Sequence, residues 1–245
     1  MFILSDFRNR FGDRLGSWTR GTRASGALEQ ELKGIWPRPV VGLPKHLDYE
    51  WVVGLPWYLK NIKGNRVLDA GFMAHLEFTK LLVQLGFEVY GVDLQAFDSD
   101  REGFTTFKEC VWETPFIDGY IDLIVANSLL EHLGLEFYGQ PKLKNAKKAT
   151  MKEFNRILSP GGTLLLQVPY GKSPTLIRYK GQDFYRVLTK TRLSELLEDF
   201  QIEEKAYFAK LSKGWLQISE AIADKIDQGE GFPACLVYVK AKKGV

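Results

Sequence analysis

The chain has 245 residues, of which 45% are hydrophobic and 26% are charged, and its formal net charge is +3. This composition is that of a folded protein with a large core rather than of a disordered chain. The charge is too small to indicate a nucleic-acid partner, and no apolar run approaches the ~20 residues of a membrane-spanning helix. We therefore expect a cytoplasmic protein that acts on neither nucleic acid nor a membrane.

The two cysteines, Cys110 and Cys235, are not part of a CxxC motif. Such sparse cysteines argue against a disulfide framework and against a thiolate zinc site. The three histidines are too scattered along the sequence to suggest a metal cluster. We therefore predict two reduced thiols and no bound metal.

Two regions of different character divide the chain. Residues 1–48 contain several glycines and arginines and a proline-rich stretch at 36–44, a composition typical of loops and short helices that cover a core. We predict that they form an N-terminal extension or lid, and that the main domain spans residues 49–245. A helix is expected at the start of this domain, over Tyr49–Leu59.

From residue 66 onward, short apolar runs alternate with longer amphipathic segments. Strands separated by helices need crossover connections, and these produce a parallel sheet with helices on both faces. We therefore predict an α/β fold with a Rossmann-like, doubly wound, mostly parallel sheet. Strands are expected at 66–69, 87–93, 120–127, 163–168, 202–208 and 234–239, and helices at 77–85, 146–158 and 189–200.

A nucleoside-binding pattern follows the first two predicted strands. Ligands of such sheets bind beyond the carboxyl ends of the strands, where the strand order reverses. Asp69 and Gly71 lie at the end of the first strand, and Asp93 ends the second, where a carboxylate can accept hydrogen bonds from both ribose hydroxyls. The same residues also suit a plain strand–helix–strand unit with a helix-capping aspartate. A dinucleotide site is disfavoured because residues 71–76 keep only the first glycine of GxGxxG.

Four segments extend this pattern: VLDAGFMAHL at 67–76, VYGVDL at 89–94, TPFIDGYIDLIVANSLLEHLGL at 114–135 and NRILSPGGTLLLQVPYGK at 155–172. In this order they resemble the class I S-adenosylmethionine-dependent methyltransferases, from about Tyr49 to the C-terminus. The motifs EHLGLEFYG and VPYGK are further similar to a poorly characterised bacterial and archaeal subgroup of methyltransferase type 11-like proteins, often suspected of acting on glycans. The resemblance implies the class I methyltransferase fold and S-adenosylmethionine as cofactor.

The resemblance also implies which residues contact the cofactor, with two departures from the family pattern. Met73 occupies the position of the usual second glycine of the first motif, and Cys110 aligns with the acidic residue that accepts from the adenine amino group. Glu109, or backbone atoms near Val111, are alternative partners for the adenine. The residues expected to contact the cofactor are Asp69, Gly71, Phe72, Met73, Asp93, Leu94, Cys110, Val111 and Asn127.

Catalysis by such an enzyme depends on geometry, because the cofactor carries an activated methyl group. A hydroxyl acceptor also needs a general base, and His132 is our candidate because an unperturbed imidazole titrates close to neutral pH. Glu131 is expected to orient the substrate or to contact the cofactor. A structural role for this pair, at a helix start or in the core, is the alternative. The side chains expected to contact a small-molecule or glycan substrate are Tyr138, Tyr170, Lys172, Tyr185 and Arg186.

The sequence leaves two classes of function open, and it does not determine the oligomeric state. The first is a methyltransferase directed to an oxygen of a sugar, a glycan or another small polar acceptor. The second is a methyltransferase-like fold that serves as a catalytically inactive binding or scaffold subunit, which Met73 and Cys110 motivate. A group of lysines indicates a solvated face or, as the alternative, a surface for an anionic partner. These are Lys142, Lys144, Lys147, Lys148 and Lys152.

Overall fold

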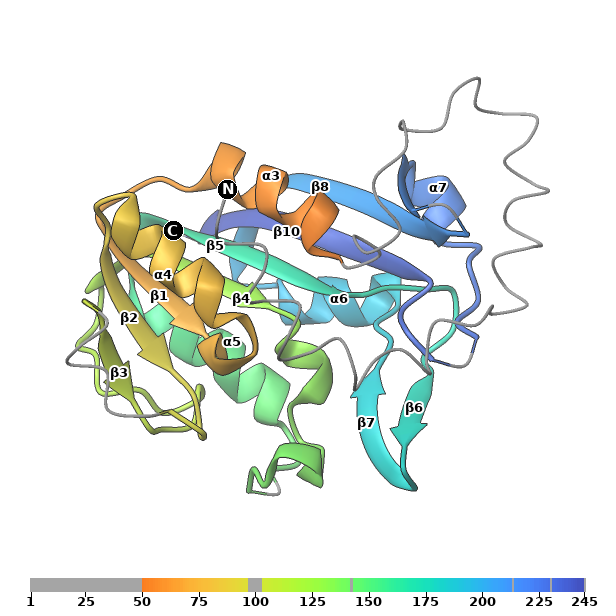
Figure 1. Ribbon diagram of the computed structural model, residues 1–245, viewed down its shortest axis with the longest axis horizontal. Coiled ribbons are helices and arrows are strands. Elements are labelled where there is room, and N and C mark those ends of the chain that lie inside the picture. Colours follow the sequence, from red (N-terminus) through yellow and green to blue (C-terminus); the bar gives the residue numbers. More distant parts are fainter. Residues whose placement is uncertain (1–49, 97–102, 142, 213, 230, 245) are drawn as a thin grey trace.

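The computed structural model describes residues 50–96, 103–141, 143–212, 214–229 and 231–244. The predicted N-terminal extension lies outside these residues. The described residues form one eight-stranded sheet, one two-stranded sheet and helices that pack on both faces of the larger sheet (Figure 1).

The large sheet is mostly parallel. Its strands are β1 (Arg66–Ala70), β2 (Glu88–Val92), β3 (Thr105–Phe107), β4 (Ile121–Asn127), β5 (Leu158–Pro169), β8 (Phe200–Leu211), β9 (Gly214–Ile218) and β10 (Cys235–Lys243), in the order β3-β2-β1-β4-β5-β10-β8-β9. Pairs from β3 to β5 are parallel, whereas β10 is antiparallel to both β5 and β8, and β9 is antiparallel to β8. β8 therefore runs in the same direction as β5. This arrangement confirms the predicted doubly wound, mostly parallel sheet.

Helices lie on both faces of the sheet (Figure 1). They are α3 (Trp51–Asn61), α4 (Leu76–Gln84), α5 (Ala146–Ile157), α6 (Lys190–Leu196) and α7 (Glu220–Ala223), with short 3-10 helices at Phe72–His75, Leu130–His132 and Glu136–Tyr138. The helices α3, α4, α5 and α6 correspond to the four predicted ones, with shifted ends. After α4, Gly86 adopts a left-handed φ of 88°, as expected of a residue that follows a helix. None of the described helices is long and apolar enough to cross a membrane.

Successive side chains of a strand point to opposite faces of the sheet. The core around this sheet therefore consists of two clusters, one on each face. Leu68, Ile124 and Leu166 point to the face where α5 and α6 pack, and they belong to one cluster with Phe154 and Leu193. The second cluster lies on the opposite face, under α3 and α4, and contains Val67, Val125, Leu165, Trp57, Tyr58 and Phe78. Burial on both faces explains why the central strands are nearly continuous apolar runs in the sequence.

Several elements differ from the sequence prediction. Ser159–Gly162, which lies between the helix predicted at 146–158 and the strand predicted at 163–168, is part of β5, and the pairing of β5 with β4 shifts register between Ile121 and Leu123. A hairpin of β6 (Leu176–Tyr179) and β7 (Gln182–Arg186) was not predicted. The strands β3 and β9 were missed as well. These strands have only three to five residues, too few to show the apolar alternation that marks a strand.

The turn after β1 packs directly on β2. Phe72 is fully buried and lies so close to Gly91 that a Cβ atom added at residue 91 would be 2.7 Å from Phe72 Cδ1. The amide of Gly71 donates a hydrogen bond to the carbonyl of Val92 at 2.8 Å. These two contacts hold the start of the turn beside the end of β2.

We expect the Gly91→Ala variant to lose about 1–3 kcal/mol of unfolding free energy, because the added methyl group overpacks the site against the Phe72 ring. Urea denaturation followed by circular dichroism measures this loss. In the double variant Gly91→Ala with Phe72→Leu, the combined loss should be smaller than the sum of the two single losses. Additive losses would contradict the proposed contact.

Candidate functional site

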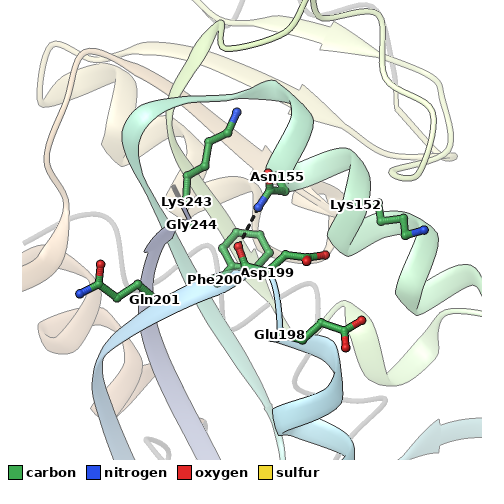
Figure 2. A pocket seen from close by; sticks show the side chains of 8 residues that line it. All are labelled: Lys152, Asn155, Glu198, Asp199, Phe200, Gln201, Lys243 and Gly244. Carbon is green, nitrogen blue, oxygen red and sulfur yellow. Dashed lines mark hydrogen bonds between the residues drawn. The ribbon is translucent and has the colours of Figure 1, made fainter.

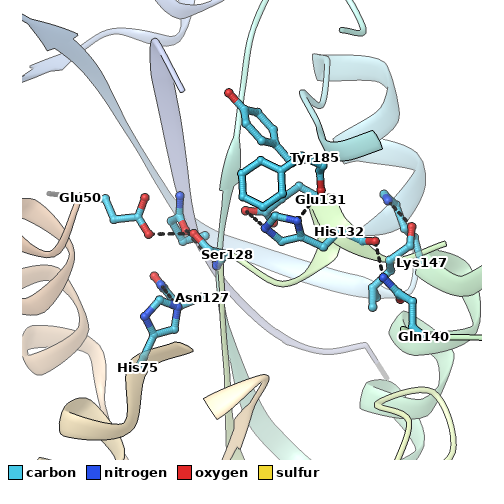
Figure 3. Close-up of polar contacts among 12 residues, drawn as sticks. Glu50, His75, Asn127, Ser128, Glu131, His132, Gln140, Lys147 and Tyr185 are labelled. Atoms are coloured by element: carbon cyan, nitrogen blue, oxygen red, sulfur yellow. Dashed lines mark hydrogen bonds and ion pairs between the residues drawn. The ribbon is translucent and has the colours of Figure 1, made fainter. Parts of the chain in front are cut away.

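The order of the strands reverses between β1 and β4, because β2 and β3 follow on one side of β1 and β5 follows β4 on the other. In sheets of this type, ligands bind at the carboxyl ends of the strands beside the reversal. Figure 3 shows side chains that meet at this edge: His75 from the turn after β1, Asn127 and Ser128 from the end of β4, and Glu50, which precedes α3.

Asp93 follows β2 and is half-buried at this edge. Its Oδ1 accepts a hydrogen bond from the amide of Gln95 at 2.8 Å, and its Oδ2 accepts one from the amide of Met73 at 3.3 Å. Burial raises the pKa of this carboxyl, and the two amides oppose the shift. An ionised carboxylate offers about four acceptor positions. The carboxylate of Asp93 therefore keeps capacity for further donors, such as a pair of hydroxyls.

Gly71 and Met73 shape the turn beside Asp93. Gly71 has a left-handed φ of 78°, and a Cβ atom at this position would lie 3.0 Å from Leu129 Cδ1, so the turn approaches the loop after β4 closely. The Met73 side chain packs against the apolar cluster under α3 and α4.

Asp69 is buried beneath the same turn, and its Oδ2 accepts a hydrogen bond from Thr79 Oγ1 at 2.7 Å. Burial raises the pKa of Asp69 to about 7, with a smaller contribution in the same direction from the charge of Asp93, while the Thr79 hydroxyl lowers it. The hydrogen bond joins α4 to β1.

His75 links the ends of β1 and β4. Trp51 Nε1 donates to His75 Nδ1 at 3.1 Å, and His75 Nε2 lies 2.9 Å from Asn127 Nδ2. Asn127 also contacts the hydroxyl of Tyr58 at 2.8 Å. Burial lowers the pKa of His75 to about 4, so the ring is neutral at physiological pH. This network holds the turn after β1 against the end of β4.

Ser128 lies between Glu50 and Gln167, with a left-handed φ of 48°. Its Oγ is 2.8 Å from Glu50 Oε1 and 2.7 Å from Gln167 Oε1. A hydroxyl carries one proton, so both contacts are hydrogen bonds at once only when Glu50 is protonated. Burial raises the pKa of Glu50, which is consistent with a protonated carboxyl.

Glu131 and His132 form the next group along the chain (Figure 3). His132 Nδ1 lies 2.6 Å from the carbonyl oxygen of Phe184, which can only accept, so Nδ1 carries the proton and Nε2 keeps its lone pair. His132 Nε2 is 4.0 Å from Glu131 Oε1. Burial lowers the pKa of His132 to about 4 and raises the pKa of Glu131 to about 8. Both groups are therefore mainly neutral at pH 7.

Aromatic side chains surround His132. The ring of Tyr138 meets the imidazole edge to face at 5.1 Å, and the ring of Phe184 lies at the same distance on a tilted plane. The Tyr185 ring centroid is 6.3 Å away, and its hydroxyl donates to the carbonyl of Gly231 at 2.6 Å. Tyr138 is 42% exposed, so one aromatic ring beside the imidazole faces solvent.

The structure brings only some of the expected substrate residues to this region. Tyr138 and Tyr185 contact His132, and Arg186 follows in β7. The hydroxyl of Tyr170, in contrast, donates to Asp224, and the side chain of Lys172 forms an ion pair with Asp227. Those two residues are engaged by the C-terminal part of the chain, so we do not include them in the candidate site.

The segment expected to contact adenine lies beside Asp93. The amide of Asp93 donates to the carbonyl of Phe107 at 3.1 Å, which places the ends of β2 and β3 together. Beyond β3, Cys110 is half-buried and Val111 is buried, while Leu94 is half-buried after β2. Burial raises the pKa of the Cys110 thiol, and the nearby carboxylates Glu109 and Glu113 act in the same direction.

A surface hollow of about 690 Å³ lies elsewhere (Figure 2). Its lining residues are Lys152, Asn155, Glu198, Asp199, Phe200, Gln201, Lys243 and Gly244. Phe200 and Gln201 begin β8, which runs parallel to β5, so the hollow is at the amino ends of the parallel strands. It is therefore on the opposite edge of the sheet from Asp93 and His132.

The chain matches the family model described as a methyltransferase domain over residues 45–203, which is more than half of its length. It therefore belongs to this family, and its fold is that of the class I S-adenosylmethionine-dependent methyltransferases. S-adenosylmethionine is the cofactor that family and fold imply. No protein among those with curated functions matches the chain.

Solved structures share the fold at low sequence identity. One is a 1,6-didemethyltoxoflavin-N1-methyltransferase of Burkholderia thailandensis with bound S-adenosylhomocysteine, at 18% identity and a TM-score of 0.55, covering 98% of this chain and 87% of that one. Another is an S-adenosylmethionine-dependent methyltransferase of Methanosarcina mazei, at 16% identity and a TM-score of 0.54, covering 78% and 98%. The [4+2]-cyclase SpnF, at 15% identity and a TM-score of 0.56, covers 91% and 93%. The fold thus does not define the reaction.

The residues at this edge of the sheet fit the adenosine half of this cofactor. Asp93 retains acceptor capacity for two ribose hydroxyls, and Gly71 provides a backbone without a side chain beside it. Met73 packs away into the apolar cluster. A further sign of a polar ligand is Gln167 Nε2, which is buried and without a hydrogen-bond partner in the described part of the chain.

Sequence reasoning did not single out Glu50, Ser128 or Gln167. Glu50 comes from a segment far from β4 in sequence, and only folding brings it to Ser128. Gln167 did offer a signal, because it is one polar residue within the apolar run of β5 and is fully buried in the structure.

We expect the Asp93→Ala variant to bind S-adenosylhomocysteine about 10- to 100-fold more weakly, because it loses a charged acceptor for the ribose hydroxyls. Isothermal titration calorimetry measures the change. Asp118→Ala, which removes an exposed carboxylate on the Arg156 side of the molecule, should bind like the unchanged protein. Equal affinities for all three proteins would contradict the assignment of Asp93.

Proposed function

We propose that this chain transfers the methyl group of S-adenosylmethionine to a hydroxyl oxygen of a sugar or another small polar acceptor, with His132 as general base. The observation that carries the proposal is the orientation of the imidazole. The carbonyl of Phe184 holds the proton of Nδ1, so the lone pair of Nε2 is available to accept a proton. His132 lies just beyond β4, at the edge of the sheet where this fold binds its ligands.

Bound S-adenosylmethionine would supply an activated methyl group on a positively charged sulfur. We propose that Asp93 binds the ribose, that Gly71 admits the ligand to the turn, and that Asn127 borders it at the end of β4. Asp69, Phe72, Met73 and Leu94 would support this part of the site, and Cys110 and Val111 would border the adenine. The predicted N-terminal extension would complete the site as a lid.

The protonation of Glu131 and His132 suits proton transfer from a hydroxyl. A neutral imidazole accepts the proton at Nε2 and becomes a buried cation, which is unfavourable unless a negative charge is near. Glu131, whose Oε1 is 4.0 Å from Nε2, provides that charge once it has released its own proton to solvent as the pH rises. We therefore assign His132 the proton transfer and Glu131 the stabilisation of the imidazolium.

The rings around His132 support an acceptor with an apolar face. Tyr138 presents a partly exposed aromatic surface at 5.1 Å from the imidazole. Aromatic rings pack well on the C–H faces of sugars while the hydroxyls stay free for hydrogen bonds. Such packing would hold one hydroxyl near Nε2, which is the positioning that methyl transfer needs.

Replacing the base tests the proposal. With an acceptor identified from a panel of sugars by transfer of labelled methyl groups, His132→Asn should lower kcat by 10²–10⁴-fold, because the hydroxyl keeps its proton longer. Binding of S-adenosylhomocysteine by calorimetry should be unchanged. If the unchanged protein binds that ligand but methylates none of the acceptors with or without cell extract, the inactive-scaffold function replaces this proposal.

The reaction rate should depend on the ionisation of Glu131. Burial raises the pKa of Glu131 to about 8, so the carboxylate that stabilises the imidazolium forms as the pH rises through this value. We expect kcat to increase between pH 7 and pH 9 and the Glu131→Gln variant to lose this increase. A pH–rate profile of both proteins provides the measurement. The same profile in both would remove Glu131 from the mechanism.

A further inference from the structure

Lys147 differs from the other lysines near α5. Lys144, Lys148 and Lys152 are exposed, whereas Lys147, in the first turn of the helix, is half-buried and turned toward the loop that carries His132. Its Nζ donates a hydrogen bond to the carbonyl of Leu133 at 2.8 Å, and Figure 3 shows it beside that loop. The ammonium group of Lys147 is therefore fixed by this hydrogen bond rather than free in solvent.

Arg186 reaches the same carbonyl from β7. Its Nη1 donates to Leu133 O at 3.4 Å, and the side chain is half-buried. Two cations thus share one neutral acceptor; burial lowers the pKa of Lys147, and repulsion from Arg186 lowers it further. Within the residues that the structure describes, neither Lys147 nor Arg186 forms an ion pair with a carboxylate.

The groups nearest to this pair do not cancel its charge. Glu131 is the carboxyl that interacts with Lys147, and burial raises its pKa to about 8, so it is mainly neutral at pH 7. Burial, and then the repulsion of Arg186, lower the pKa of Lys147 to about 8, so Lys147 is mainly charged at that pH. His132 is neutral. Even when Glu131 is ionised, its single negative charge faces two cations, Lys147 and Arg186, so this region carries an excess of positive charge.

The N-terminus of α5 adds to the positive potential around Lys147 and Arg186. α5 has twelve residues, and its N-cap residue Asn145 forms no side-chain cap, so the positive end of the helix lies next to Lys147. The amides at a helix N-terminus and the aligned peptide dipoles attract anions. Three sources of positive potential, on α5 and β7, thus meet at Leu133, the residue that follows His132.

We propose that Lys147 and Arg186 form an anion subsite, which binds a carboxylate or phosphate group of the methyl acceptor. The inference rests on the proposed function and narrows its substrate to an acidic sugar or a sugar phosphate. Arg186 would contact two oxygens with its planar guanidinium, while Lys147 would supply a point charge. The anion would displace neither residue far, because both already converge on Leu133. The hydroxyl to be methylated would then lie on the His132 side of the bound group.

Binding of three probes tests this subsite without relying on turnover. Glucuronate supplies a carboxylate, glucose 6-phosphate a phosphate, and glucose neither, and calorimetry or ligand-observed NMR compares their affinities for the full chain. We expect the two anionic probes to bind at least tenfold more tightly than glucose, with affinity falling as salt is added. The anionic probe that binds more tightly shows whether the subsite prefers a carboxylate or a phosphate. Equal binding of all three probes would overturn the proposal.

Substitutions of single cations test whether the anionic probes bind at Lys147 and Arg186. Lys147→Met and Arg186→Met should each weaken the anionic probes about 10- to 100-fold, whereas Lys148→Met and Arg192→Met, which remove exposed cations on α5 and α6, should not. Lys147→Arg keeps the charge and should keep the binding, which separates loss of charge from loss of folding. Equal weakening in the two control variants would indicate only a diffuse surface attraction and would overturn the assignment.

The affinity for S-adenosylhomocysteine shows whether Lys147 and Arg186 bind the acceptor or the cofactor. S-adenosylhomocysteine also carries a carboxylate, and its affinity should be the same for the unchanged protein, Lys147→Met and Arg186→Met. A tenfold loss in these variants would assign the pair to the cofactor and overturn the acceptor subsite. If the anionic probes bind as expected but no methyl transfer is detected, the subsite stands as a ligand site and the proposed reaction fails.

Discussion

The reversal of strand order between β1 and β4 is the constraint on which the candidate site depends. Two loops leave the sheet at this point in opposite directions, so the space between them is filled by side chains and ligands rather than by a further strand. Asp93, His75 and Asn127 reach that space from separate elements. Because β1 and β4 are both buried on two faces, the position of these loops is fixed by packing on each side of the sheet.

Burial at this edge shifts several ionisable groups toward their neutral forms. Asp69 and Glu131 have raised pKa values, and His75 and His132 have lowered ones, with loss of solvent as the main cause in each case. Such groups present lone pairs and protons to a ligand. A charge that forms during a reaction would then interact strongly with the few groups able to ionise.

The proposed site has two sides, which are formed by different parts of the chain. The turn after β1 and the end of β2 form the side suited to a nucleoside, where Asp93 is the principal acceptor. The β6–β7 hairpin forms the other side, where the carbonyl of Phe184 orients His132 and Arg186 joins Lys147 at the carbonyl of Leu133. A change in the hairpin would therefore affect the acceptor side first and the nucleoside side little.

The sequence by itself determined the fold class, because apolar runs and amphipathic segments alternate in a way that only a sheet covered on both faces can bury. Its motifs also identified Asp93, Glu131 and His132 as candidates. The tertiary structure decided the rest. Glu50 reaches Ser128, and Lys147 meets Arg186, only after segments distant in sequence pack together. A side chain's burial and partners set its pKa and its role, and neither can be read from local sequence, which specifies backbone periodicity but not contacts between distant segments.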